Sequence, residues 1–138
     1  MTSGRRLGTV LRVAALQERL AKAEAGRAAG AVEAARTAQT TRQQALASSR
    51  LTTDTPAGLQ QALSLQRLRA QAVTEAAADV VLAHDARTAA VQAWTGARAR
   101  ARLLDEMDRR LRAERLAAEL GAAQRLADDL TSGRRAPR

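Results

Sequence analysis

The chain has 138 residues, 23 basic and 14 acidic side chains, a net charge of +9 and no cysteine. It has one tryptophan and no phenylalanine or tyrosine, and alanine supplies most of its apolar fraction of 46%. Alanine favours helix but buries little area, so this composition excludes a globular core of large side chains, a disulfide framework and a thiolate zinc site.

The residue types favour an all-α fold. Alanine, arginine, leucine, glutamate and glutamine dominate, as in coiled coils and long helices. The chain has two prolines, Pro56 and Pro137, and neither lies in a periodic stretch. We therefore predict two long helices that form an antiparallel coiled-coil hairpin, in one domain covering residues 1–138.

The first helix is predicted over about residues 5–50. Apolar residues cluster in its first third, thin to alanine in the middle and recover at Leu46. Gly26 and Gly30 each weaken the middle by roughly 1 kcal/mol relative to alanine, but no proline or turn cluster stops the helix there.

A turn is predicted at about residues 51–57. Residues 48–58 form the densest cluster of serine, threonine, aspartate, proline and glycine before the C-terminus. Proline suits the first position of a helix, so we expect Pro56 there, with Thr55 or Asp54 as the N-cap.

The second helix is predicted over about residues 58–131, followed by a disordered basic tail at 132–138. We expect its apolar face to include several leucines, and the step from Leu111 to Leu116 to depart from a strict heptad. The residues expected on this face begin with Leu59, Ala62, Leu63, Leu68, Ala72 and Val73, continue through Ala76, Val80, Ala83, Ala90, Trp94, Ala97 and Ala101, and end with Leu104, Met107, Leu111, Leu116, Leu120, Ala123, Ala127 and Leu130.

The second helix is longer than the first, so part of it should overhang the hairpin. Counted back from the turn, the overhang begins near Asp108 and includes Leu111 and Leu130. Apolar residues on an unpaired helix are a place to look for a partner.

The stretch 93–115 holds the tryptophan and a cluster of arginines, Arg98, Arg100, Arg102, Arg109, Arg110, Arg112 and Arg115. Three acids precede three of these arginines by four residues, an orientation that stabilises a helix by roughly 0.2–0.5 kcal/mol per pair. The pairs are Asp105–Arg109, Glu106–Arg110 and Asp108–Arg112. The arginines are either a solvated face paired with its own acids or an electropositive strip for an acidic partner. Trp94 is either packed in the core or an exposed anchor for a partner.

No catalytic constellation is present in the sequence, and we expect neither enzymatic activity nor a cofactor. His84 is the only histidine, with no second imidazole or thiolate for zinc, so we expect an ordinary helix residue. Adjacent acids such as Asp128 and Asp129 point about 100° apart on a helix and converge poorly on a metal. We also expect no secretory signal and no membrane span, because the apolar runs are short.

The sequence resembles the FliJ family of flagellar export proteins, which is related to the stalk proteins of type III secretion. The length and two-helix plan carry the resemblance, together with the N-terminal run 7–13 followed by Leu16, Gln17 and Glu18. A third feature is Ala93-Trp94, which is followed by the arginine-rich stretch 97–115 and, later, by the acidic segment 126–130. The resemblance covers essentially the whole chain.

The resemblance implies a cytoplasmic stalk-like coiled coil at the inner face of the cell membrane. The end that holds the termini would insert into the ring of the export ATPase, and the turn end would engage the export-gate membrane protein and help to escort substrate chaperones. Apolar residues flanked by arginines on the overhang favour a protein partner with an acidic rim, and the resemblance implies that this partner is the ATPase, bound at Arg109, Arg112, Arg115, Leu111 and Leu116. The gate contacts would fall near Gln43, Leu46, Leu63 and Leu68.

The net charge also permits a different function, in which a basic coiled coil binds nucleic acid through phosphate contacts. The acids inside the arginine cluster and the lack of aromatic residues for base stacking argue against it.

Overall fold

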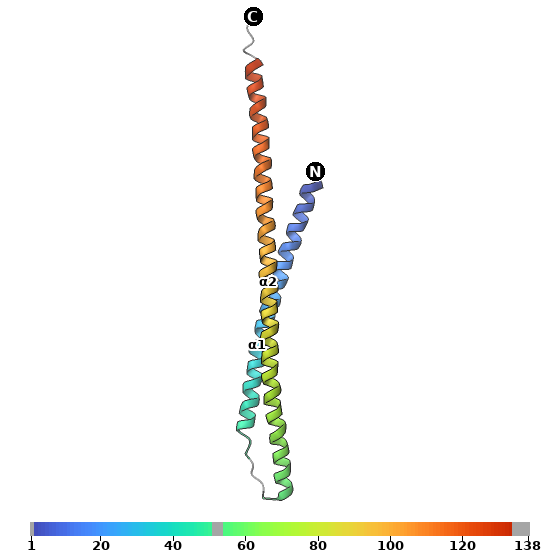
Figure 1. Cartoon of the computed structure of the whole chain (residues 1–138), viewed down its shortest axis with the longest axis vertical. Coiled ribbons are helices and arrows are strands. Elements are labelled where there is room, and N and C mark those ends of the chain that lie inside the picture. Colours follow the sequence, from blue (N-terminus) through green and yellow to red (C-terminus); the bar gives the residue numbers. More distant parts are fainter. Residues whose placement is uncertain (1, 51–53, 134–138) are drawn as a thin grey trace. The chain divides into compact units, whose positions relative to one another are not determined.

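The computed structural model describes residues 2–50 and 54–133, and the side chains of 6–50 and 54–132. This part of the chain is helical apart from the short connection and has no strand. Its two helices are α1, Thr2–Ala47, and α2, Pro56–Gly133 (Figure 1). The prediction of an all-α fold is confirmed.

The helix ends lie within a few residues of those predicted. α1 stops at Ala47, where the hydroxyl groups of Ser48 and Ser49 donate to the carbonyl oxygens of Ala45 and Leu46. Serine hydroxyls of this kind compete with helical backbone bonds. Of the predicted turn, residues 51–53 lie outside the described residues. Of the predicted tail, Ser132 and Gly133 still belong to α2, and residues 134–138 lie outside the described residues.

Thr55 begins α2. Its side-chain oxygen accepts a hydrogen bond from the backbone N–H of Gly58 at 3.2 Å, and its carbonyl accepts one from Leu59 at 3.0 Å. Pro56 follows as the first helical residue, where its missing N–H costs nothing. Of the two caps that the sequence allows, Thr55 takes this position.

The contacts group the chain into two units, although the sequence predicts a single hairpin domain. The middle unit is Gln17–Ala97, and the terminal unit combines Met1–Leu16 with Arg98–Arg138. Each unit is described by itself below.

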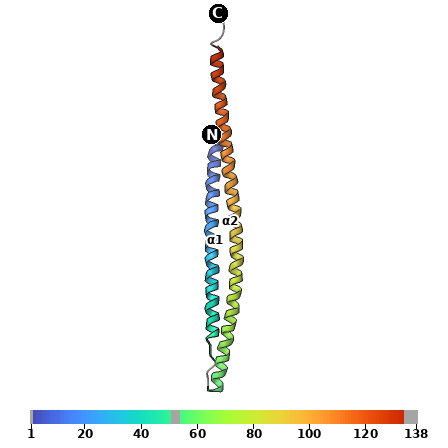
Figure 2. The same cartoon turned by 90° about the vertical axis from the view of Figure 1, so that its left-hand side faces the viewer.

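In the middle unit, α1 and α2 lie side by side and run in opposite directions (Figures 1 and 2). Arg36 of α1 contacts His84 of α2, and Arg42 donates to the carbonyl oxygen of Ala72 at 3.3 Å. A later residue of α1 thus meets an earlier residue of α2, as antiparallel packing requires.

The interface of the middle unit is lined mainly by alanine. Val32 and Ala76 are 0% and 2% exposed and mark its centre. Most shielded residues follow alternating steps of three and four on both helices, which is the spacing of a coiled-coil seam, with one step of seven from Ala83 to Ala90 past the exposed Arg87. On α1 they are Ala21, Ala25, Ala28, Val32, Ala35 and Gln39; on α2 they are Ala62, Gln66, Arg69, Val73, Ala76, Val80, Ala83, Ala90, Trp94 and Ala97.

The residues that the sequence predicts on the buried face of α2 from Ala72 to Ala97 are all shielded, but the prediction that leucines begin this face is wrong. Leu59, Leu63 and Leu68 are 45%, 39% and 63% exposed. Their steps of four and five residues do not follow one face, whereas the alanine positions keep the seam spacing through the whole unit. Small side chains also let two helices approach closely along their length. These three leucines therefore remain on the outer faces of α2.

Replacing Gly26 by alanine should stabilise the middle unit. A Cβ atom at this position meets nothing within 4 Å, and no glycine in the described residues has a positive φ. Alanine in a helix interior is favoured over glycine by about 1 kcal/mol, so the midpoint of thermal unfolding should rise by roughly 4–8 °C. The reciprocal change Ala31→Gly, at a nearby exposed position, should lower the midpoint by a similar amount. Equal midpoints for Gly26→Ala and the parent would contradict this account.

Candidate partner-binding surface

In the terminal unit, the shielded residues also keep steps of three and four. They are Leu7, Leu11 and Ala14 on α1, and Ala101, Leu104 and Asp108 on α2, with Ala14 8% exposed. Beyond Asp108, every residue of α2 up to Ser132 is exposed except Gly121, which is half-buried. The candidate surface lies on this exposed part of α2.

Three arginines of this surface form the ion pairs that the sequence predicts. Arg109 pairs with Asp105, Arg110 Nε lies 3.0 Å from Glu106 Oε1, and Arg112 Nη2 lies 2.6 Å from Asp108 Oδ2. The arginine side chains are 70% to 74% exposed, so each pair adds only a few tenths of a kcal/mol. The pairs hold the guanidinium groups against the helix surface and leave them open to solvent.

Other arginines of α2 keep their charge uncompensated. Among the described residues, no acid forms an ion pair with Arg100, Arg102 or Arg115. The sequence segments of the terminal unit contain 14 basic and 7 acidic residues, whereas the middle unit contains 9 and 7. Most of the net charge of the chain therefore belongs to the terminal unit.

The five residues predicted for the ATPase contact do not share one face. Arg109, Arg112 and Leu116 follow steps of three and four along α2 and lie on the same side of the helix. Leu111 is five residues before Leu116, which turns it about 140° away, and Arg115 lies on Leu111's side. Leu111 and Leu116 are 37% and 57% exposed. The face that the geometry assembles is thus Arg109, Arg112 and Leu116.

The residues predicted for the export-gate contact are also divided between faces. Gln43 is exposed, and Leu46 is half-buried on the seam side of α1. Leu63 and Leu68 are five residues apart on α2 and point in different directions. Leu68 instead lies with Leu65 in a shallow hollow lined by Ala57, Gln60, Gln61, Ser64, Leu65 and Leu68. Leu65 was not among the predicted contacts, although Gln61, Leu65 and Leu68 are separated by four and three residues and therefore lie on one side of the helix.

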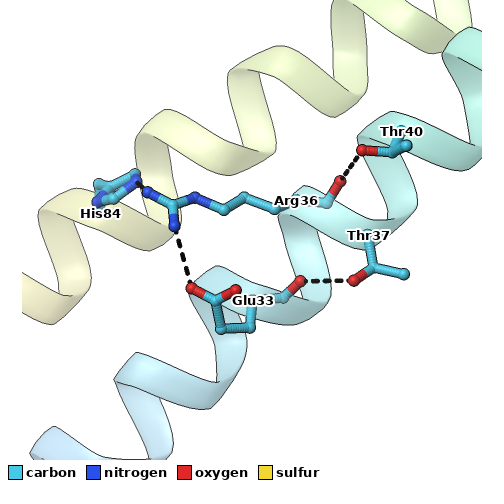
Figure 3. Close-up of polar contacts among 5 residues, drawn as sticks. All are labelled: Glu33, Arg36, Thr37, Thr40 and His84. Carbon is cyan, nitrogen blue, oxygen red and sulfur yellow. Dashed lines mark hydrogen bonds and ion pairs between the residues drawn. The ribbon is translucent and has the colours of Figure 1, made fainter.

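A polar contact joins the two helices in the middle unit (Figure 3). Arg36 donates to Glu33 Oε1 at 3.1 Å and reaches across to His84 Nε2, also at 3.1 Å. Arginine has only donors, so the ring nitrogen of His84 acts as the acceptor in this contact. His84 is therefore a cross-helix contact, and nothing local in the sequence indicates Arg36 as its partner.

No metal site is visible in the part of the chain that the structure describes, where no three potential ligands from histidine, cysteine, aspartate and glutamate gather. Asp105 and Glu106 instead form ion pairs with Arg109 and Arg110.

Trp94 is half-buried at a seam position and its Nε1 atom is buried. This position favours the interpretation that Trp94 packs in the core over the interpretation that it is an exposed anchor for a partner.

Comparison with known proteins adds no assignment, because no family model, curated protein or solved structure matches the chain. Neither helix, over its described residues, contains a segment with the length and hydropathy needed to cross a membrane.

Proposed function

We propose that the protein is a non-enzymatic component of the bacterial flagellar type III export apparatus. It would act as a stalk-like coiled coil that contacts the export ATPase and the export gate and assists the delivery of substrates with their chaperones. The sequence resemblance to the FliJ family suggests this role. The observation that carries the ATPase contact is the exposed face of α2 with Arg109, Arg112 and Leu116.

The proposal includes an antiparallel hairpin whose second helix overhangs the first. α2 has 78 residues and α1 has 46, which corresponds to a difference in length of about 48 Å. The continuous exposure of α2 beyond Asp108 supports an overhang that begins there. This overhang would enter the ATPase ring, and its exposed arginines would meet acidic residues of the ring.

The turn end would contact the export gate in this proposal, near Gln43, Leu46, Leu63 and Leu68. The exposed leucines and the shallow hollow at Leu65 and Leu68 support a contact with a protein surface. The protein would then work in the cytoplasm, peripheral to the inner face of the cell membrane, without a cofactor or small-molecule substrate.

The test is ATP hydrolysis by the cognate export ATPase with and without the purified protein. At low salt, the protein should bind the ATPase and increase hydrolysis that depends on the assembled ring. Heat-denatured protein serves as the control for non-specific effects. Absence of both binding and stimulation would refute the proposal.

Nucleic-acid binding is the second candidate, favoured by the basic charge of the terminal unit. It predicts affinity for DNA that falls steeply with salt, with a slope set by the number of phosphates contacted. Titrations of duplex and single-stranded DNA at two salt concentrations distinguish it from the export function. Because acids lie within the arginine cluster, we expect this protein to bind DNA no more tightly than an unrelated helical protein of equal charge does.

A further inference from the structure

The last four turns of α2 carry a second apolar line that the proposed function does not use in full. Leu116, Leu120, Ala123, Ala127 and Leu130 follow steps of four, three, four and three, the spacing of a coiled-coil seam. The three leucines are 57%, 62% and 67% exposed. This part of α2 is therefore built as half of a helix–helix interface, and no described residue covers it.

This line is distinct from the face that α2 shields in the same unit. The steps from Ala101 through Leu104 and Asp108, continued toward the C-terminus, arrive at Leu111, Arg115, Ala118, Ala122, Arg125 and Asp129. Three of these six residues are charged, and no large apolar residue follows Leu111 on this face. The leucine line starts one position later, which turns it about 100° around the helix. A partner on this line would thus not replace the existing contacts of α2.

We infer that a second copy of this chain pairs antiparallel along the leucine line, with Ala123 at the two-fold axis. In this register Leu116 of each copy faces Leu130 of the other, and Ala123 faces its own equivalent. Leu120 packs on Ala127, with Leu126 beside it. Each large side chain at the inner positions meets a small one, and the pattern is self-complementary, as a two-fold interface requires.

The charges of this segment are compatible with a second copy. Residues 113–132 contain four acids and two arginines. Most of these acids lie off the leucine line. The flanking Glu119 faces Leu126 and Ala127 of the other copy, so the register opposes no like charges across the seam.

The charges also select the antiparallel direction. Residues 98–115 carry seven arginines and four acids. A parallel pair would place two of these basic segments side by side, whereas the antiparallel pair sends them away from each other in opposite directions. The contact from Leu116 to Leu130 is only about 21 Å long, so pairing should be weak and depend on protein concentration.

Light scattering on the full chain over a wide range of concentrations tests the pairing. The parent should shift from monomer to dimer, and the variant Leu116→Gln with Leu130→Gln should need at least about tenfold more protein for the same shift. The matched control Leu65→Gln with Leu103→Gln alters two leucines that are equally accessible, and should dimerise like the parent. A parent that stays monomeric, or a control that loses dimerisation equally, overturns the inference.

Single cysteines test the register, because the chain has none of its own. Under mild oxidation, Ala123→Cys should form a disulfide-linked dimer, and Ala118→Cys on the outer face should not. Leu116→Cys should cross-link to Leu130→Cys in a mixture but not to itself. Self-linkage of Leu116→Cys would mean a parallel pair, and equal linkage at positions 118 and 123 would mean random collision; either result overturns the proposal. The inference does not depend on the export function, since neither experiment contains the ATPase.

Discussion

The substitution Val32→Asp should unfold most of the interface between the two helices of the middle unit. Val32 is 0% exposed and is the largest fully buried side chain of the described residues. Aspartate has nearly the same size, but its short side chain cannot carry the carboxylate to solvent. An uncompensated buried charge costs about 3 kcal/mol or more, which corresponds to a fall of roughly 12–24 °C in the thermal midpoint.

Ala34→Asp is the matched control, because Ala34 is exposed on the same helix two residues away. It introduces the same charge and the same weak helix former, and it should cost less than about 1 kcal/mol. Thermal unfolding followed by circular dichroism compares the two variants. Equal losses would show that helix propensity, and not burial at the alanine seam, controls stability.

The double charge reversal Arg109→Glu with Arg112→Glu should weaken the proposed binding to an export ATPase by at least about tenfold. These arginines share an exposed face with Leu116, so reversal would turn attraction to an acidic partner into repulsion. It also places each new glutamate four residues after an aspartate, but like charges at this spacing cost only roughly 0.2–0.5 kcal/mol per pair. Helix content should therefore stay unchanged, and a pull-down with parallel circular dichroism measures both properties.

A variant with exchanged charges separates binding from helix stability. Adding Asp105→Arg and Asp108→Arg to the double reversal restores both intrahelical ion pairs and the net charge of the segment. If binding depends on the positions of the arginines, this variant should bind as weakly as the double reversal. Parental binding by the double reversal would exclude this face as the ATPase site, and recovery in the exchanged variant would mean that helix stability was the cause.

The features that could be predicted from the sequence depend on residues close together in the chain. The ion pairs at Arg109, Arg110 and Arg112 follow from i, i+4 spacing alone, and Pro56 limits the helix cap to Asp54 or Thr55, of which the structure shows Thr55. Both helices were also predictable, because few residues in the chain could interrupt them. For such features the local backbone already fixes which atoms can meet.

The α2 seam from Ala72 to Ala97 was predicted correctly from its spacing, but the start of this seam and the cross-helix contacts could not be predicted in the same way. Large apolar residues such as Leu63 and Leu68 seemed the natural choice for burial, but the spacing of the alanines determined which face could be shared along the whole unit. The contact between Arg36 and His84 joins residues 48 positions apart, so it depends on the alignment of the two helices. The proposed ATPase residues were split between two faces because Leu111 and Leu116 are five residues apart.

The alanine seam gives the middle unit a nearly repeating surface. A displacement of one helix along the other by seven residues would place alanine against alanine again at many positions. The larger side chains distinguish one alignment from the next. They are the pair Arg36–His84 and the seam residues that are not alanine, Val32, Gln39, Gln66, Arg69, Val73, Val80 and Trp94. The register of the two helices in this unit therefore depends on these larger side chains, and substitutions there can shift the register of the entire pair.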